Sequence, residues 1–418
     1  MKKVLIFFFI IIYSCNNSNK IVIEKDELID KLEGFWLGQS IANWTGLVTE
    51  MNKIGFSKDG TQEAFYTRDN WGKMNEKSWG SNQIIDFKFA KKDSIWGSDD
   101  DTDIEYMYQE LLLDNNTLLL TDSQIRDGWL KHIKKEEENY LWVSNQKAFD
   151  LMKNGILPPE TSSPDLNPHY EMIDAQLTTE VFGLYSPLNP EYALLMSSLP
   201  IRTVARENAE WISQFYIIMH SLSYFENGKV PVKEKIGLIA DEARKILPDE
   251  YYSAKMYDFV KEKYQSGISW EAARDSLNLR YQINQMDNYM WATKDKSCHG
   301  CFAAGINFGA SIISLLYGEG DYKKTVQIAS LCGWDSDNPA ATWGGLLGFI
   351  YGAEEIKNLF DIEMSEKYNI HRTRVNFSND GKDSFKNMAI KSMKIIEKVI
   401  TEKLNGKINE SKFILNKI

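Results

Sequence analysis

The chain contains little cysteine and no excess of positive charge. Four cysteines in 418 residues are too few for a scaffold built on disulfides. The 48 lysines and arginines are outnumbered by 59 aspartates and glutamates, which gives a net charge of -11, whereas a nucleic-acid-binding surface needs an excess of positive charge. No apolar run reaches the roughly 20 residues of a membrane-spanning helix. The sequence therefore excludes a disulfide-rich module and an integral membrane protein, and we expect no nucleic-acid partner.

The N-terminus has the pattern of a cleaved targeting segment. Two lysines precede nine apolar residues, Val4 to Ile12, which are too few to span a bilayer. The following residues, Ile12-Tyr13-Ser14-Cys15, resemble a bacterial lipoprotein box, in which the cysteine is lipidated. We therefore predict a signal peptide over residues 1–14, a lipid on Cys15 and a polar tether over residues 15–26. An ordinary secretory signal is the alternative.

This pattern predicts a location in the cell envelope. The protein would be a lipoprotein of the outer membrane, with a soluble body on the periplasmic or surface face. Contact with the membrane is expected through the lipid anchor only, because the acidic body would not adhere to anionic lipid. We expect a monomer.

The body of the chain has the apolar periodicity of helices. Apolar residues return every three or four positions, as in residues 103–113, and Thr121 begins a capping-box pattern ahead of a further helix. Residues 51–66 could hold short strands, but they fit an irregular insertion or hairpin better. Neither a repeat nor a linker-like change of composition divides the body. We predict one all-α domain over residues 27–402 and a peripheral tail over residues 403–418.

Two acidic clusters are the strongest candidates for chemistry. The first is Ser98-Asp99-Asp100-Asp101-Thr102-Asp103, and the second is Gly333-Trp334-Asp335-Ser336-Asp337-Asn338. Helix capping accounts for one or two carboxylates in each cluster. It does not account for three consecutive aspartates, because adjacent like charges repel unless a cation holds them together. Oxygen ligands of this kind suit Mg²⁺, Ca²⁺ or Mn²⁺.

Two other metal or redox patterns fit less well. An EF-hand loop starting at Asp99 would need glycine at its sixth position, where Ile104 stands. Cys298 and Cys301 have the Cys-x-x-Cys spacing, but a zinc site needs four ligands and no second pair exists. A local disulfide or two buried thiols are the remaining explanations for this pair, and a substrate contact by His299 stays open.

The two acidic clusters, together with a glycine-rich segment near the start, resemble the ADP-ribosylglycohydrolase family. Residues 34–50, Gly-Phe-Trp-Leu-Gly-Gln-Ser-Ile-Ala-Asn-Trp-Thr-Gly-Leu-Val-Thr-Glu, look like the family's opening helix, which ends in Gly-Asp, another Gly and a Glu. Asp99-Asp100-Asp101-Thr102 is similar to its Thr-Asp-Asp-Thr motif. Gly333 to Asn338, followed by a Gly/Ala-rich helix, is similar to its Gly-Gly-Asp-Thr-Asp-Thr motif. The resemblance spans about residues 28–356, most of the body.

The resemblance implies a compact helical fold around a central dinuclear metal site. Two Mg²⁺ ions, with Mn²⁺ as the alternative ion, would hold the ribose diol beside the scissile bond and a water. The implied metal ligands are Asp99, Asp100, Asp101, Asp335, Asp337 and Asn338. Catalytic roles would fall to Glu50, Asp100 and Asp337, and substrate contacts to Asn43, Trp44 and Trp334.

Three departures from the family pattern affect the expected substrate. Asp99 and Asn338 stand where the family has threonines, and Ala42-Asn43 stands where it has Gly-Asp. The expected activity is hydrolysis of an N- or O-glycosidic bond at a ribosyl carbon of an ADP-ribosyl or other glycosyl substrate. One alternative is an extracellular glycoside hydrolase acting on a furanoside or another glycan. Another is a metal-dependent sugar- or nucleotide-binding lipoprotein without turnover.

Overall fold

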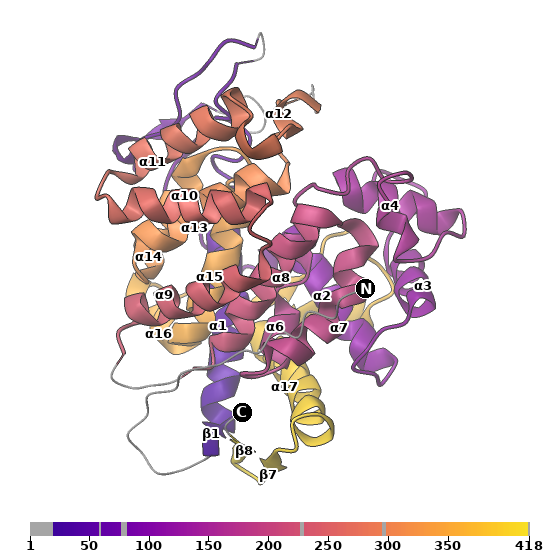
Figure 1. Cartoon of the computed structure of the whole chain (residues 1–418). Helices are drawn as coiled ribbons and strands as arrows, with labels where there is room; N and C mark the ends of the chain where they lie inside the picture. Colours follow the sequence, from indigo (N-terminus) through magenta and orange to yellow (C-terminus); the bar gives the residue numbers. More distant parts are fainter. Residues whose placement is uncertain (1–19, 58–59, 77–81, 226–229, 295–297, 417–418) are drawn as a thin grey trace.

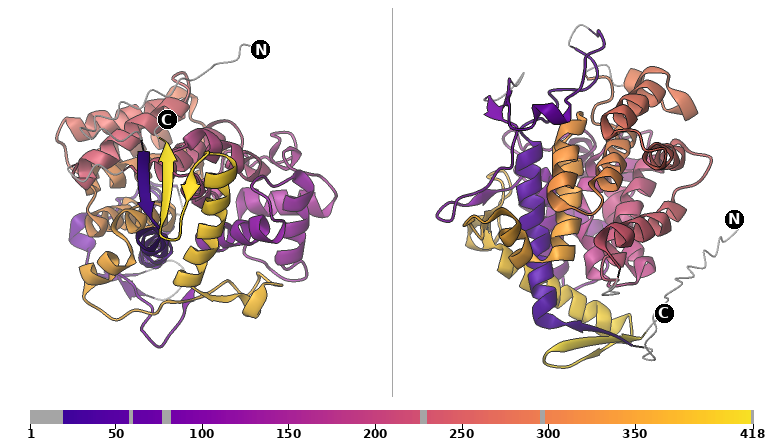
Figure 2. Two further views of the ribbon diagram at one scale, coloured as in Figure 1. Left: turned by 90° about the horizontal axis from the view of Figure 1, so that it is seen from below. Right: turned by 90° about the vertical axis from the view of Figure 1, so that its left-hand side faces the viewer.

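Two helices rich in small residues form the centre of the fold (Figures 1 and 2). The computed structural model describes residues 20–57, 60–76, 82–225, 230–294 and 298–416. In it, α1 (Lys25–Gly46) packs along α15 (Asp337–Tyr351). A Cβ atom on Gly38 would lie 2.4 Å from the backbone oxygen of Gly344. The two backbones therefore approach each other at a distance that only glycine permits.

The other helices surround this pair. Those that follow α1 in the first half of the chain are α2 (Asp100–Asp114), α3 (Asp122–His132), α4 (Val143–Lys153), α5 (Asp174–Thr178), α6 (Val181–Tyr185), α7 (Pro190–Val204) and α8 (Glu207–Leu222). The second half adds α9 (Val232–Ala243), α10 (Tyr252–Gln265), α11 (Trp270–Leu277), α12 (Trp291–Lys294), α13 (Ala304–Gly318), α14 (Tyr322–Cys332), α16 (Ala353–Phe360) and α17 (Phe385–Glu402). The prediction of a single helical domain is confirmed.

Short strands lie at the margins of the helical body. β1 (Lys20–Glu24), β8 (Lys412–Asn416) and β7 (Lys407–Ile408) form an antiparallel sheet in that order. The other strands are β2 (Met74–Asn75), β3 (Gln83–Ile84), β4 (Trp96–Gly97), β5 (Lys367–Asn369) and β6 (Lys382–Ser384). β2 pairs with β3, while β5 lies between β4 and β6. These strands are minor additions to a mostly helical fold.

The first sheet corrects the predicted boundaries at both ends of the body. The tether was predicted to extend to residue 26, but residues 20–24 form β1 and α1 begins at Lys25. The predicted peripheral tail contributes β7 and β8, and Phe413 in β8 is fully buried. Figure 2 shows β1 and β8 side by side, although they come from opposite ends of the chain. Alternating apolar residues explain the pairing, because Ile21 and Ile23 lie opposite Leu415 and Phe413.

Several local predictions agree with the structure. Residues 103–113 lie within α2, and Thr121 caps α3 with the capping box completed by Gln124. The described residues of the insertion predicted at 51–66 form turns, bends and irregular stretches, and a bridge joins Phe56 to Gln62. The predicted signal peptide and Cys15 lie outside the described residues. Within the described ranges, no helix is both long and apolar enough to cross a bilayer.

Candidate functional site

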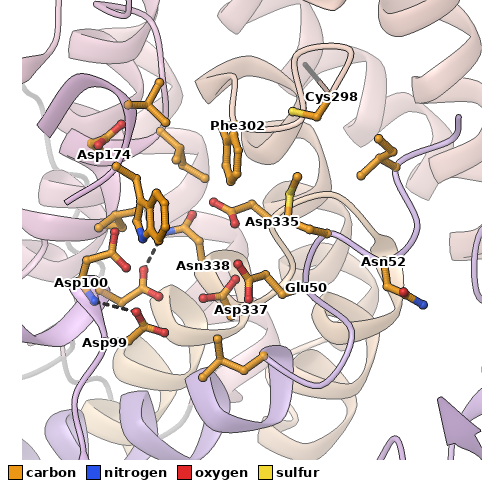
Figure 3. A pocket seen from close by; sticks show the side chains of 18 of the residues that line it. Glu50, Asn52, Asp99, Asp100, Asp174, Cys298, Phe302, Asp335, Asp337 and Asn338 are labelled. Atoms are coloured by element: carbon orange, nitrogen blue, oxygen red, sulfur yellow. Dashed lines mark hydrogen bonds between the residues drawn. The ribbon is translucent and has the colours of Figure 1, made fainter. Parts of the chain in front are cut away.

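A cavity of about 860 Å³ opens beside the end of α1 and the starts of α2 and α15. Its lining includes Glu50 and the aspartates of both acidic clusters. These residues come from three segments that lie far apart in the sequence. Figure 3 shows the labelled carboxylates facing a common space, with Phe302 above Asp335.

The first acidic cluster lies at the beginning of α2. Asp99 is the N-cap residue, and its carboxylate accepts a hydrogen bond from the backbone N–H of Asp100 at 2.8 Å. Asp99, Asp100 and Asp101 each offer one carboxylate oxygen within 4.8 Å of the others. Helix capping therefore accounts for the position of Asp99. It does not account for Asp100 and Asp101, whose carboxylates lie close to that of Asp99.

The second acidic cluster lies at the beginning of α15. Asp335 is in the turn after α14, Asp337 is the first residue of α15, and Glu50 follows the end of α1. Their carboxylate oxygens also lie within 4.8 Å of one another. The turn requires Gly333, whose φ is +97°, a value that residues with a side chain rarely adopt. Glu50 thus forms a group of three carboxylates with the two aspartates.

Two asparagines connect the clusters. The side-chain amide of Asn43 donates to Asp101 at 2.6 Å and reaches Asp337 at 3.5 Å. The amide nitrogen of Asn338 donates to the other oxygen of Asp101 at 3.0 Å. The oxygen of Asn338 in turn accepts a hydrogen bond from Gln176 at 3.2 Å. The amides of Asn43 in α1 and Asn338 in α15 therefore hold the carboxylate of Asp101 at the start of α2.

Comparison with known proteins agrees with this geometry. The family model described as ADP-ribosylglycohydrolase matches residues 24–371, which include both acidic clusters and Glu50. The chain belongs to the ADP-ribosylglycohydrolase family. It is accordingly a hydrolase that acts on glycosyl bonds.

Two further comparisons add nothing to the assignment of the family. A solved structure titled "ADP-ribosylglycohydrolase-related protein complex" has 14% sequence identity and a TM-score of 0.48 over 89% of this chain and 99% of that chain. No curated protein matches the chain.

The electrostatics of this family site favour a bound cation. Burial raises the pKa of Asp100, Asp101 and Asp335 well above the usual range, and neighbouring aspartates raise each further. A divalent cation would offset this repulsion and hold the carboxylates ionised. Carboxylate oxygens are the ligands that Mg²⁺ and Mn²⁺ prefer. The residues present therefore fit the metal dependence that is typical of the family.

Three residues expected to contact substrate lie elsewhere. Asn43 is 2% exposed and acts on Asp101, as described above. Trp44 donates from its indole to the backbone oxygen of Gly97 and packs on Trp96, with ring centroids 4.7 Å apart. Trp334 is fully buried against Phe65. None of the three is among the described residues that line the cavity. Asn43 contacts the lining residues Asp101 and Asp337, and each tryptophan packs on a neighbouring aromatic ring.

Asn338 has a structural role besides the one that was predicted for it. It lines the cavity, as expected for a ligand position. Its side-chain nitrogen faces Asp101, however, and its oxygen accepts from Gln176. In this arrangement Asn338 orients the carboxylate of Asp101. Its role as a direct metal ligand stays a prediction, because an amide oxygen that accepts one hydrogen bond keeps a second lone pair.

Except for His299, for which the sequence left a substrate contact open, the aromatic lining of the cavity comes from residues that the sequence did not single out. These residues are Phe56, Tyr140, Trp142 and Phe302. His299 also lines the cavity and stacks on Phe56, with ring centroids 4.5 Å apart. No spacing rule marks these positions, because they come from irregular segments whose course depends on the whole fold.

The cysteine pair beside His299 forms a disulfide between Cys298 and Cys301. This confirms one of the two explanations left open for the Cys-x-x-Cys pattern. The disulfide closes the turn that presents His299 and Phe302 to the cavity. The third described cysteine, Cys332, is a buried thiol.

Proposed function

We propose that this family member is a lipid-anchored, Mg²⁺-dependent glycohydrolase that cleaves an N- or O-glycosidic bond at a ribosyl carbon. One observation carries the proposal: six carboxylates, Glu50, Asp99, Asp100, Asp101, Asp335 and Asp337, line a single cavity in two groups of three. Such a pair of oxygen-rich groups is suited to two adjacent divalent cations.

The reaction requires groups that this cavity can supply. Cleavage at an anomeric carbon passes through an oxocarbenium-like state, and it needs a water to attack and a proton for the leaving group. Divalent cations, when bound, supply positive charge that orients a vicinal diol and lowers the pKa of a water. We assign cation binding to Asp100 and Asp337 and their neighbours. We assign to Glu50, which is outside both aspartate motifs, the positioning of the diol and the acceptance of a proton.

The anchor and the location rest on the sequence. The lipoprotein box at Cys15 supports attachment to a membrane of the cell envelope, with a monomeric body outside the cytoplasm. This location also favours the main alternative, a glycoside hydrolase of the same family that acts on a furanoside or another extracellular glycan.

The test is metal-dependent release of a reducing sugar from N- and O-linked ribosides. We expect release in the presence of Mg²⁺, a loss of at least about 100-fold after treatment with EDTA, and recovery on addition of Mg²⁺ or Mn²⁺. Release that EDTA does not affect would contradict the proposal. Metal-dependent binding without release would favour the non-catalytic sugar-binding alternative.

A further inference from the structure

We propose that the outward face of the sheet formed by β1, β8 and β7 docks on an anionic phospholipid surface and fixes the orientation of the protein on the membrane. This inference rests on the lipid anchor of the proposed function and goes beyond it, because a single attachment at Cys15 does not determine which side of the body faces the membrane. It departs from the expectation that only the lipid contacts the membrane, which was drawn from the acidic charge of the body as a whole.

The sheet is the part of the described structure that lies nearest to the proposed anchor along the chain. Four residues, 16–19, separate Cys15 from Lys20, the first residue of β1. Each residue adds at most about 3.6 Å to an extended chain, so Lys20 lies within roughly 18 Å of the lipidated cysteine. The anchor therefore keeps this sheet close to the membrane.

One face of the sheet packs on the helical body, and the other is directed outward. Side chains alternate between the two faces along each strand, and Phe413 and Leu415 of β8 are buried in the core. The intervening residues and their register partners form the outward face, which we call the outer sheet face: Lys20, Val22 and Glu24 in β1, Lys412, Ile414 and Asn416 in β8, and Lys407 in β7. Although Val22 is aliphatic, it is 50% exposed.

The outer sheet face combines an aliphatic centre with positive charge. Val22 and Ile414 lie opposite each other in the register of β1 and β8. Glu24 is the carboxylate of this face, and it forms an ion pair with Lys412 at 2.8 Å. The other two charged residues of the face are lysines, one in β1 and one in β7. Lysine can lay its aliphatic stem along an apolar surface while its ammonium group reaches a phosphate, so this combination suits a layer of lipid head groups.

The segment that contains most of this sheet is basic, although the chain as a whole has a net charge of -11. Residues 382–418, which include β6, α17, β7 and β8, contain nine lysines and four acidic residues. The left-hand view of Figure 2 shows α17 beside the sheet on the face seen from below. Asp26 and Glu27 in the first turn of α1 are nearby opposing charges, and Glu27 pairs with Lys31 at 2.9 Å. An anionic lipid surface attracts such a basic segment.

Docking on this face places the catalytic cavity away from the membrane. β1 leads directly into α1, and the cavity lies beside the other end of α1. In the right-hand view of Figure 2, α1 stands upright while β1 runs sideways from its foot. A helix of 22 residues is about 33 Å long. The cavity is thus held on the order of 30 Å from the lipid surface, which favours a substrate in solution over a membrane lipid.

A fluorescent probe on the outer sheet face tests the docking. Val22→Cys introduces a thiol for an environment-sensitive dye, since Cys298 and Cys301 form a disulfide and Cys332 is buried. The lipidated protein is extracted from the cell envelope and reconstituted into vesicles of phosphatidylcholine, either alone or mixed with phosphatidylglycerol. We expect the emission to be at least about twofold higher on the anionic vesicles, and to return toward the value on neutral vesicles when salt is raised to about 1 M.

Two further variants provide the controls. Reversing the charge of the face with Lys20→Glu and Lys407→Glu together is expected to abolish the increase in emission at position 22. The dye on Leu279→Cys should respond to neither lipid. Leu279 is 52% exposed and lies between α11 and α12, at the end of the molecule away from the sheet (Figure 1). None of these positions lines the cavity, so glycohydrolase turnover should be unchanged in every variant and shows that each one is folded.

A second measurement uses the wild type and needs no substitution. Acetylation of lysines by an amine-reactive reagent is followed by mass spectrometry on both kinds of vesicle. Lys407 is exposed on the outer sheet face, and Lys323 is exposed on α14. Anionic vesicles are expected to slow the acetylation of Lys407 by about threefold or more relative to that of Lys323. This measurement decides the question if a labelled variant does not fold.

The outcomes separate the docking from the proposed function. Equal emission at position 22 on neutral and anionic vesicles, with the protein floating on both, would overturn the docking and leave the lipid anchor standing. An increase that survives the double charge reversal would also overturn it. Emission that rises with protein concentration in the absence of vesicles would identify a second copy of the chain as the occupant of this face. Protein that does not float with neutral vesicles would contradict the anchor and the inference with it.

Discussion

The variant Asp100→Asn is expected to lose glycohydrolase turnover by about 100- to 1,000-fold, because it removes one carboxylate charge from the predicted metal site. Asp100 and its neighbours Asp99 and Asp101 form one of the two groups of carboxylates in the cavity. The amide of asparagine keeps the size of the side chain but binds a divalent cation more weakly. Turnover and the affinity for Mg²⁺, measured by calorimetry, should therefore fall together.

The stability of Asp100→Asn separates this effect from misfolding. Burial and the neighbouring Asp99 and Asp101 raise the pKa of Asp100, so its charge destabilises the metal-free protein. The metal-free variant should accordingly unfold at the same temperature as the wild type or at a higher one. Asp114→Asn, at the exposed end of the same helix α2, is the control and should retain full activity. Undiminished turnover in Asp100→Asn would show that the site is assigned incorrectly.

The second large effect is expected from Gly46→Ala, in which one methyl group displaces a metal ligand. A Cβ atom on Gly46 would lie 2.3 Å from the Cα of Asp337 and 2.8 Å from the backbone oxygen of Ser336. Both neighbours are backbone atoms, so α1 and the start of α15 must move apart. The backbone N–H of Glu50 also donates to the oxygen of Gly46 at 3.0 Å, which couples Glu50 to the same movement.

We expect Gly46→Ala to lower the free energy of unfolding by about 1–3 kcal/mol, as overpacked positions do. Turnover should fall by on the order of 100-fold, since a displacement of about 1 Å at a reacting group has that effect. Chemical denaturation and hydrolysis kinetics measure the two quantities. Gly237→Ala is the matched control, because Gly237 lies within α9 and a Cβ there meets nothing within 4 Å. That variant should be as stable as the wild type or slightly more stable. Wild-type behaviour of Gly46→Ala would contradict the close packing of α1 on α15.

The sequence was sufficient to locate the carboxylates of the site. Runs of aspartate at the start of a helix exceed what capping needs, and this excess is visible without a structure. The pairing of the two clusters through Asn43 could not be derived from spacing, since Asn43 is 58 residues from Asp101 and 294 residues from Asp337. Helix propensity and capping were also sufficient to predict α3, where Thr121 and Gln124 form the predicted capping box.

The positions of the two tryptophans that were predicted to contact substrate could not be derived from the sequence, for a physical reason. Trp44 and Trp334 are adjacent in sequence to site residues, but neighbouring side chains on a helix or turn point in different directions. In the structure Trp44 packs on Trp96 and Trp334 packs on Phe65. Residues from irregular segments, such as Tyr140 and Phe56, line the cavity. Similarly, the pairing of β1 with β8 joins the two ends of the body, and such long-range contacts leave only a weak local pattern.

The departures from the family motifs have a structural explanation. Asp99 caps α2, a role that threonine can also fill. Asn43 and Asn338 both donate hydrogen bonds to Asp101 and hold it with neutral groups. An aspartate at position 43 would add another negative charge beside Asp101 and Asp337. The substitutions thus preserve the arrangement of the carboxylates while changing their surroundings.

The central claim is that the two groups of carboxylates bind divalent cations together. Anomalous diffraction from crystals soaked in Mn²⁺ tests it most directly. The account predicts two anomalous peaks in the cavity, one within about 2.1 Å of oxygens of Asp99, Asp100 or Asp101 and one within about 2.1 Å of oxygens of Glu50, Asp335 or Asp337. A cavity without anomalous signal at saturating Mn²⁺, or peaks only at surface carboxylates, would contradict the account.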